Sequence, residues 1–300
     1  MRFNKLDLNL LVALDALLTE RSISRAAEKI HLSQSAMSNA LSRLREYFGD
    51  ELLVQIGRKM EPTPRAEGLA DAVRDVLVRV EATISTQPEF SPETSTRLFR
   101  LLVSDYTLAT LMPPFLASVY ERAPGIRIDL RPQVADPRRA LERADADLLI
   151  IPKDYCSPEH PAEFLFEEDF CCVIWAESSL ATGDLTRERY LEAGHVVVVP
   201  GQGQPAIEDW IIQRLGVSRN VGVTTFNFAA PAQLVVGTDR IATMHRRLAV
   251  QAARLEAIVL REVPLPMPPM QQSMQWHTHR TTDLGLAWLR AVLRETSLTL

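Results

Sequence analysis

The sequence is short of cysteine, lacks long uncharged apolar runs and has no strong excess of charge of either sign. Its three cysteines, Cys156, Cys171 and Cys172, are an odd number and two are adjacent, so no disulfide framework is predicted. No apolar run reaches the roughly 18 residues that span a bilayer, and the first residues lack a secretory pattern. These absences predict a protein of the reducing cytoplasm that has no membrane segment.

The small overall charge hides a difference between two parts of the chain. The formal net charge is −5, but residues 1–65 hold ten Lys and Arg against eight Asp and Glu. The remaining residues hold 23 basic against 30 acidic side chains, so the first part carries +2 and the rest −7. This mild asymmetry suggests local basic contacts with nucleic acid on a larger acidic body.

Motifs of catalytic or metal-binding chemistry are weak. His277 and His279 have the spacing of two metal ligands, but no Cys or acidic partner is placed with them. Cys171, Cys172 and His195 could suggest a thiol nucleophile, yet adjacent strand residues face opposite sides and buried cysteines are common. We therefore expect no enzyme activity, no metal site and no cofactor.

The start of the chain predicts three helices in quick succession, within a chain long enough for two or three domains. The first helix runs to about Glu20 and has leucines at spacings of three and four: Leu10, Leu11, Leu14, Leu17 and Leu18. Ser24 is the predicted N-cap of a short helix through Ile30. Ser33 caps a third helix, from Gln34 to about Tyr47, which Gly49 ends.

The outer face of this third helix is polar but uncharged. It consists of Gln34, Ser35, Ser38, Asn39 and Ser42. A merely solvated face normally carries Glu and Lys pairs, whereas neutral donors and acceptors at this spacing suit base edges in a major groove. We therefore predict a DNA recognition helix, with Arg43 and Arg45 at its far end placed for phosphates.

A two-stranded wing and a long helix are predicted next. The strand-like segment 52–56 leads to a Gly57-Arg58-Lys59 turn, whose basic tip suits a minor groove or phosphate, with a solvated turn as an equal alternative. Residues 86–96, rich in Pro, Ser and Thr, predict a hinge. Between them, one helix from Arg65 to about Thr86 carries an apolar stripe narrow enough for a dimer seam: Leu69, Val73, Val76, Val80 and Ile84.

Beyond Arg97, strand and helix patterns alternate. The predicted strands are 98–103, 126–130, 148–151, 170–175, 196–199, 221–225, 240–243, 258–263 and 273–276. Helical patterns fill gaps at 108–122, 137–144, 207–215 and 284–295. Such alternation predicts parallel sheets covered on both faces, in two α/β lobes with a ligand cleft at the strand ends.

Several motifs resemble one known family. Residues 24–39, Ser-Arg-Ala-Ala-Glu-Lys-Ile-His-Leu-Ser-Gln-Ser-Ala-Met-Ser-Asn, are similar to the helix-turn-helix signature of LysR-type transcriptional regulators, and Arg58 with Pro62-Thr63-Pro64 resembles their wing and its exit. The resemblance covers essentially the whole chain. It implies an α/β protein with a winged helix-turn-helix at 1–65, a linker and dimerisation helix with a hinge at 66–96, and a two-lobed, periplasmic-binding-protein-like sensor at 97–300.

The resemblance also implies which residues contact DNA. Gln34, Ser38 and Asn39 would contact bases, with phosphate contacts near Ser33, Arg43 and Thr63 and a wing contact from Arg58. Two positions depart from the family pattern: Ser35 stands where proline is common, and Gln55 where a wing arginine is frequent. Both departures make the operator sequence of this chain hard to infer.

For the sensor, salicylate-type relatives imply an inducer pocket formed by Ser104, Asp105, Thr110, Gln204, Phe226, Arg247 and Trp276. Arg247 is the foremost ligand residue, because a guanidinium can hold a carboxylate or acidified phenolate bidentately; a surface arginine in a helix is the equal alternative. Phe226 and Phe228 alternate, so at most one of them is expected to face the pocket.

The opening residues 6–11 and the segment 240–247 are most similar to a branch containing nodulation activators and regulators of aromatic and chloroaromatic degradation. The resemblance implies an activator that binds an interrupted palindrome in double-stranded DNA as a dimer, paired into a tetramer, and contacts RNA polymerase. Its implied inducer is a small aromatic such as a chlorinated phenol or hydroquinone; the alternative is a flavonoid, as in a nodulation-type activator. A solute-binding transport protein of the same two-lobed fold is disfavoured by residues 1–96 and by the missing signal peptide.

Overall fold

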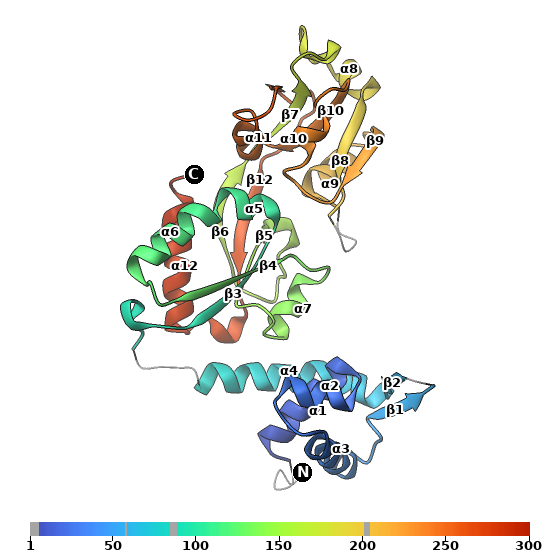
Figure 1. Cartoon of the computed structure of the whole chain (residues 1–300), viewed down its shortest axis with the longest axis vertical. Coiled ribbons are helices and arrows are strands. Elements are labelled where there is room, and N and C mark those ends of the chain that lie inside the picture. The colour runs from blue at the N-terminus through green and yellow to red at the C-terminus, as the bar shows by residue number, and fades with distance from the viewer. Residues whose placement is uncertain (1–5, 58, 85–88, 201–204) are drawn as a thin grey trace. The chain divides into compact units, whose positions relative to one another are not determined.

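The computed structural model describes residues 6–57, 59–84, 89–200 and 205–300 (Figure 1). The chain divides into two compact units, a smaller one that ends at Gln87 and a larger one that begins at Pro88. Within the described ranges, no helix is long and apolar enough to cross a membrane.

The N-terminal unit is a helical domain with a hairpin. Its elements are α1 (Leu8–Glu20), α2 (Ile23–Lys29), α3 (Gln34–Phe48), β1 (Leu53–Ile56), β2 (Lys59–Pro62) and α4 (Pro64–Ile84). Ser33 caps α3 by accepting a hydrogen bond from the Ala36 backbone N–H at 3.2 Å, and Gly49 ends the helix with φ +60°. The predicted cap of α2 was wrong, because Ser22, in an extended conformation, accepts from the Arg25 N–H, and Ser24 lies inside the first turn.

Helix α4 packs against α1 of the same chain. Val73 is buried in a core that includes Leu14 and Leu17 of α1. Arg74 fixes the pairing, since its Nε donates to Asp15 Oδ1 at 2.6 Å. The expectation that Val73 lies on a dimer seam is therefore wrong, whereas Val76 is 40% exposed and stays available to a partner.

Two five-stranded sheets form the two lobes of the larger unit. In lobe 1 the strand order is β4-β3-β5-β12-β6, and in lobe 2 it is β11-β7-β10-β8-β9. The elements of lobe 1 are β3 (Leu98–Val103), α5 (Asp105–Thr110), α6 (Met112–Arg122), β4 (Arg127–Pro132), α7 (Pro137–Glu142), β5 (Leu148–Pro152), β6 (Ala162–Glu168), β12 (Met270–Gln275) and α12 (Leu284–Ser297). Those of lobe 2 are β7 (Phe170–Trp175), α8 (Arg187–Glu192), β8 (Gly194–Val198), α9 (Ile207–Arg214), β9 (Asn220–Thr225), α10 (Pro231–Leu234), β10 (Arg240–His245), α11 (Arg246–Ala252) and β11 (Ile258–Arg261).

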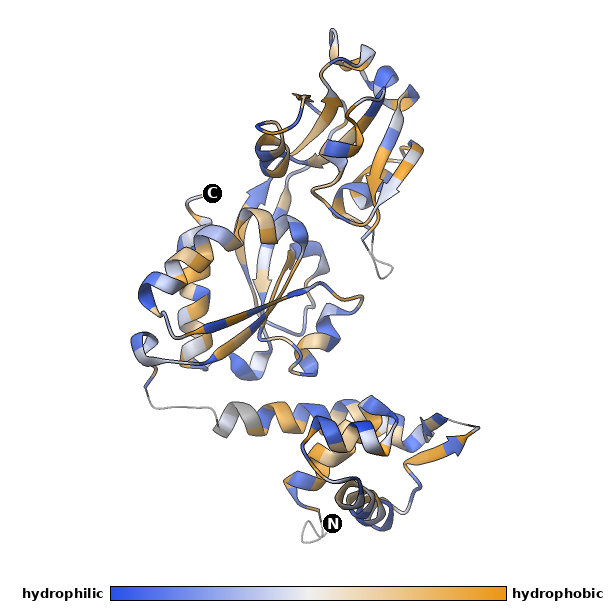
Figure 2. Ribbon diagram, viewed as in Figure 1, coloured by the Kyte–Doolittle hydropathy of each residue, from blue (hydrophilic) through white to orange (hydrophobic). Residues whose placement is uncertain are grey.

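Both sheets are mixed, which corrects the expectation of parallel sheets. Strands β3, β4 and β5 are parallel, but β12 runs antiparallel to β5 and β6. In lobe 2, β7 runs antiparallel to β10 and β11, while β8, β9 and β10 are parallel. The reason is topological: the chain passes to lobe 2 after β6 and returns before β12. Figure 2 shows that apolar residues are concentrated along the inner strands and the helix faces that cover them.

Glu208, in the first turn of α9, is a buried acid. Its side chain is 1% exposed, and its Oε2 has no hydrogen-bond partner within the described chain. Burial raises the pKa of this carboxyl group to about 8. The folded protein therefore holds a proton on Glu208 at pH values where the unfolded chain has released it.

We expect the protein to lose stability between about pH 4.5 and pH 8, because there the folded state binds more protons at Glu208 than the unfolded state does. Glu208→Gln removes this dependence, and at pH 8 it should raise the free energy of unfolding by an amount on the order of 3 kcal/mol. Melting temperatures at pH 5 and pH 8 measure the effect. Glu192→Gln, at an exposed position of α8, is the control; an equal shift of both variants at both pH values would contradict the assignment.

Candidate functional site

The outer face of α3 is exposed and uncharged over its first two turns. Its inward residues, Met37, Leu41 and Leu44, are buried in the N-terminal core. The exposed residues are Gln34, Ser35, Ser38, Asn39 and Ser42. Gln34 also lines a groove whose other walls are the end of α1, the start of α2 and strand β2. The residues predicted to read bases therefore share one accessible face, and their base contacts stay a prediction.

The two arginines at the end of α3 have different surroundings. Arg43 lies 3.2 Å from Asp7 Oδ2, and both side chains are more than half exposed, so this pair is weak and the guanidinium is accessible to a phosphate. Arg45 donates from Nε to the Glu51 carbonyl and from Nη2 to the Leu53 carbonyl, both at 2.8 Å. The expected phosphate contact of Arg45 is not supported, since this side chain holds α3 against the start of the hairpin.

Thr63, at the end of the hairpin, is less available to phosphate than predicted. The Thr63 hydroxyl donates to Asp50 Oδ1 at 2.6 Å and accepts from the Ala66 N–H, and the Thr63 N–H donates to the Leu52 carbonyl. Thr63 therefore caps α4, and it has no donor left for phosphate. Ser33 caps α3 only as an acceptor, and its hydroxyl lies 3.0 Å from that of Ser35, so its phosphate contact stays a prediction. Arg58, the predicted wing contact, lies outside the described residues.

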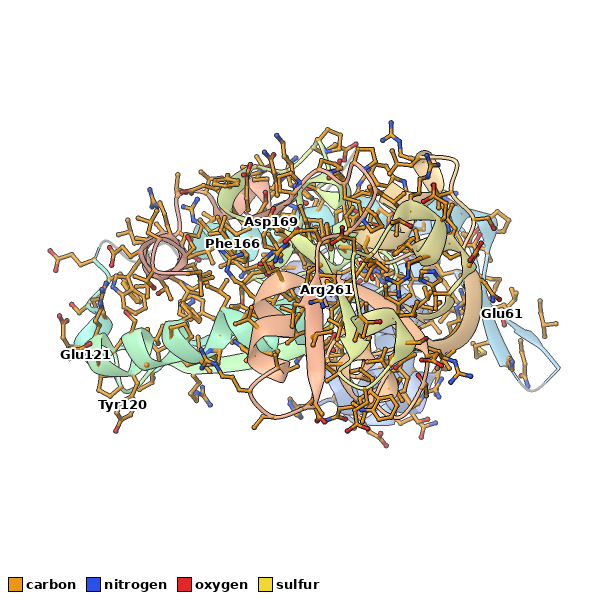
Figure 3. The ribbon with its side chains drawn as sticks, turned by 90° about the horizontal axis from the view of Figure 1, so that it is seen from above. Glu61, Tyr120, Glu121, Phe166, Asp169 and Arg261 are labelled. Atoms are coloured by element: carbon orange, nitrogen blue, oxygen red, sulfur yellow. The ribbon has the colours of Figure 1, made fainter. Side chains whose placement is uncertain are left out.

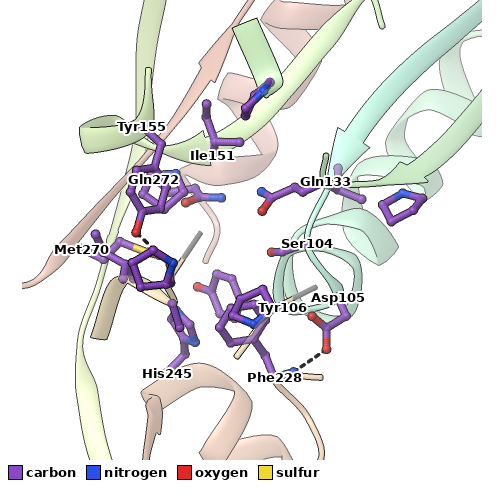
Figure 4. A pocket seen from close by; sticks show the side chains of 18 of the residues that line it. Ser104, Asp105, Tyr106, Gln133, Ile151, Tyr155, Phe228, His245, Met270 and Gln272 are labelled. Carbon is purple, nitrogen blue, oxygen red and sulfur yellow. Dashed lines mark hydrogen bonds between the residues drawn. The ribbon is translucent and has the colours of Figure 1, made fainter. Parts of the chain in front are cut away.

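A cavity of about 530 Å³ lies between the two lobes of the larger unit (Figure 4). Lobe 1 contributes residues 103–106 at the end of β3, Gln133 and Gln272 to its lining. Lobe 2 contributes residues 226–228 and His245. This volume lies within the range of sites that hold small organic ligands.

Three of the predicted inducer residues, Ser104, Asp105 and Phe226, line this cavity. Gln204 lies outside the described residues. Phe226 and Phe228 both line the cavity, so the expectation that only one would do so was wrong: β9 ends at Thr225, and strand alternation does not apply beyond it.

Three other predicted inducer residues do not line the cavity. Thr110 is buried in α5 and donates to the Tyr106 carbonyl at 2.8 Å. Trp276 is buried beneath the Arg290 guanidinium and donates to Thr281 Oγ1. Arg247 pairs with a carboxylate of the protein, and the expectation that it holds an anionic inducer is corrected on that ground.

That carboxylate belongs to Glu168, which is fully buried where the chain passes from lobe 1 to lobe 2. Its Oε2 accepts a hydrogen bond from the Tyr106 hydroxyl at 2.7 Å and another from Arg247 Nη1. Its Oε1 accepts from the Arg247 backbone N–H at 2.9 Å. Phe166 and Asp169, which flank Glu168 in the chain, are labelled in Figure 3, and the Arg247 guanidinium lies 5.0 Å from the Phe166 ring centroid. One side chain thus joins both lobes.

The ionisable groups of the cavity wall favour their uncharged forms. Burial lowers the pKa of His245 to about 3, so its imidazole is neutral, and the ring stacks on Tyr106 with centroids 4.1 Å apart. Burial also raises the pKa of Asp105, although its Oδ2 accepts from the Phe228 backbone N–H at 2.6 Å. No Lys or Arg is among the described residues that line the cavity.

The sequence reasoning missed Gln133, Tyr155, His245 and Gln272 in this lining. Gln272 lies on β12, which returns to lobe 1 after more than a hundred residues, and no local pattern indicates that return. His245 ends a strand that was predicted, and the general rule that ligands bind at strand ends could have singled it out.

The described residues do not form the metal site or the thiol nucleophile that the sequence analysis weighed. No group of three or more metal-binding side chains occurs among the residues that the structure describes, His277 and His279 included. Cys171 and Cys172 are buried, and burial raises the pKa of the Cys171 thiol to about 12, which opposes thiolate chemistry.

Two family models match the chain. Residues 8–67 match the bacterial regulatory helix-turn-helix protein, lysR family, and residues 92–297 match the LysR substrate binding domain. The chain is 42% identical to nodulation protein D 2 of Rhizobium tropici and 40% identical to nodulation protein D 1 of a Bradyrhizobium strain. Each match covers 98% of this chain, with 93% of the first relative and 94% of the second.

Solved structures share the fold over nearly the whole chain. A probable transcriptional regulator from Pseudomonas aeruginosa matches with a TM-score of 0.67 and 31% identity, covering 98% of each chain. Full-length OxyR from the same organism matches with a TM-score of 0.75 and 17% identity, covering 96% of this chain and 95% of that one. These are regulators and not enzymes. The chain belongs to the LysR family of DNA-binding transcriptional regulators.

Proposed function

We propose that this protein activates transcription in response to a flavonoid-type aromatic inducer bound between the two lobes of its sensor. The observation that carries the proposal is a cavity with aromatic walls, which include Tyr106, Tyr155, Phe226 and Phe228, and with no Lys or Arg among its described lining residues. The relatives of the chain are nodulation proteins. A cavity of about 530 Å³ suits a ligand of several rings. A chlorinated phenol or hydroquinone, the inducer expected first, is the second candidate because its single ring fills less of that volume.

The wall of the cavity and the joint between the lobes share residues. Tyr106 lines the cavity and bonds to Glu168, while His245 stacks on Tyr106 and immediately precedes α11, which carries Arg247. A ligand that contacts Tyr106 or His245 therefore acts on the packing that joins the lobes. We infer that the inducer shifts the equilibrium between two lobe arrangements by binding one of them better. The output would be an altered engagement of an interrupted palindrome and of RNA polymerase in the cytoplasm.

A reporter assay with a purified flavonoid, together with gel shifts on the promoter beside the gene, tests the proposal. Inducer-dependent transcription from a promoter that the protein binds specifically is the expected result. A response to chlorinated phenols without any response to flavonoids would favour the second candidate.

Gln34→Ala or Asn39→Ala should each cost about 1 to 3 kcal/mol of operator binding and relax sequence preference, because each removes a base-edge contact. Arg43→Ala should instead weaken binding to all DNA and flatten its salt dependence. Gel shifts on operator and unrelated DNA at several salt concentrations measure both effects. Gln251→Ala, at an exposed position of α11, is the matched control. If both Gln34→Ala and Asn39→Ala bind as the wild type does, α3 does not read the operator.

Val76→Glu should weaken self-assembly and operator binding while the domain stays folded, because Val76 is exposed and offers an apolar contact to a second α4. Val73→Glu should instead unfold the N-terminal unit, since it places a charge in that core. Light scattering and circular dichroism on the same samples separate the two outcomes. Val250→Glu, an exposed valine on α11, is the control; a Val76→Glu protein of unchanged molar mass and affinity would exclude this seam.

Glu168→Gln should raise the half-maximal inducer concentration by about tenfold or more, because a charge-assisted contact to Arg247 is worth roughly 1.5 to 3 kcal/mol. Arg247→Ala should act in the same direction by removing the partner of Glu168. Reporter titrations give the dose response, and gel shifts should show intact operator binding. Glu167→Gln, the exposed neighbouring position, should leave the response unchanged. An unaltered dose response in Glu168→Gln would show that the contact between Glu168 and Arg247 has no part in the response to inducer.

A further inference from the structure

Two glutamine side chains face each other across the cavity, and each donates one of its two amide N–H groups to a neighbouring protein group (Figure 4). Gln272 Nε2 donates to Thr107 Oγ1 at 3.1 Å, and Gln133 Nε2 donates to the Ile150 carbonyl at 3.1 Å. Gln272 Oε1 is buried and has no hydrogen-bond partner within the described chain. Each amide thus keeps a second N–H, and the partnerless Gln272 Oε1 is an acceptor buried in the wall of the cavity.

Several other residues of the wall lack a hydrogen-bond donor. Five of its residues are prolines, which have a carbonyl group but no backbone N–H: Pro132, Pro137, Pro152, Pro200 and Pro205. The Tyr155 hydroxyl donates its hydrogen to the Pro205 carbonyl at 3.0 Å. Asn227, whose carbonyl accepts from the N–H groups of Ala229 and Ala230, keeps amide N–H donors at the lobe 2 edge. The five prolines therefore contribute no backbone donor to the wall.

The described wall also lacks a positive charge that could hold an anionic ligand. Asp105 brings no positive charge, since burial raises the pKa of its carboxyl group and its Oδ2 accepts from the Phe228 N–H. His245 is neutral in its buried stack. The described lining residues supply no guanidinium or ammonium group that could pair with an anion. A carboxylate ligand would bring oxygen lone pairs against carbonyl oxygens and would lose its hydration without a compensating charge.

We propose that Gln272 and Gln133 select an uncharged aromatic ligand by accepting hydrogen bonds from its hydroxyl groups. This selection rests on the proposed function and narrows it to neutral polyhydroxylated aromatics. Carboxylates and O-methylated analogues of the same shape are discriminated against. A buried acceptor without a partner costs free energy in the empty protein, so a ligand hydroxyl that reaches Gln272 Oε1 recovers that cost on binding.

Isothermal titration calorimetry on the full-length protein tests the selection with three flavones: chrysin, chrysin dimethyl ether, and a flavone that carries a carboxylate in place of the hydroxyls. We expect the ether and the carboxylate to bind at least about tenfold more weakly than chrysin. Gln272→Leu should weaken chrysin by about tenfold and leave the affinity of the ether nearly unchanged. Gln271→Leu makes the same change one residue away, where the side chain faces away from the cavity and bonds to Lys153 and Glu167, and it should change neither affinity.

Gln133→Leu provides a second variant. Gln133 is partly exposed on a loop, so this change should destabilise the protein less than a change on the buried strand β12. It should also weaken chrysin more than the ether. Chrysin binding that neither variant changes, or equal binding of chrysin and its ether, would overturn the selection and leave the flavonoid proposal standing. Carboxylate binding as tight as that of chrysin would overturn it as well.

Resorcinol and its dimethyl ether repeat the comparison without the flavone skeleton. If no flavone binds but resorcinol is preferred over its ether, and Gln272→Leu abolishes the preference, the acceptor wall is supported and the flavonoid proposal is wrong. If neither pair of probes is discriminated, the acceptor wall has no role in selection.

Discussion

The buried carboxylate of Glu168 is the contact on which the arrangement of the sensor depends. It lies where β6 of lobe 1 gives way to β7 of lobe 2, and it accepts hydrogen bonds from Tyr106 of one lobe and Arg247 of the other. An ionised acid in a fully buried place is tolerated only when a positive charge and further donors satisfy it. The lobe arrangement that supplies those donors therefore has a stabilising contact that any other arrangement must replace.

The cavity inherits its chemistry from this joint. Because Glu168 takes the Arg247 guanidinium and the Tyr106 hydroxyl hydrogen, neither group is left to hold an anionic ligand. Tyr106 then presents its ring to the cavity and to His245. An internal ion pair thus leaves the described wall without a cation for an anionic ligand. The same pair couples the wall to the relative placement of the lobes, which is the property that a two-state sensor needs.

Local patterns predicted much of this fold, and long-range ones did not. Helix α3 begins after Ser33 and ends at Gly49 as expected, because capping depends on residues within a turn of each other. Strand β6 was missed since three of its seven residues are acidic, and Glu168 is buried only because of Tyr106 and Arg247, 62 and 79 residues away. Arg247 was assigned to the ligand for the same reason: nothing near it in the sequence reveals that the protein supplies its anion.

Several buried polar atoms of the sensor lack a hydrogen-bond partner within the described chain, His195 Nδ1 and His245 Nδ1 among them, and two oxygens of this group differ in meaning. Glu208 Oε2 and Gln272 Oε1 both lack partners within the described chain, and each should destabilise the folded protein. Burial raises the pKa of Glu208, so a proton and not a ligand removes its charge. Gln272 cannot respond in this way, because an amide oxygen does not titrate. Its side chain lies on the cavity wall. An unsatisfied acceptor at that place is explained by a hydroxyl group that arrives with the inducer.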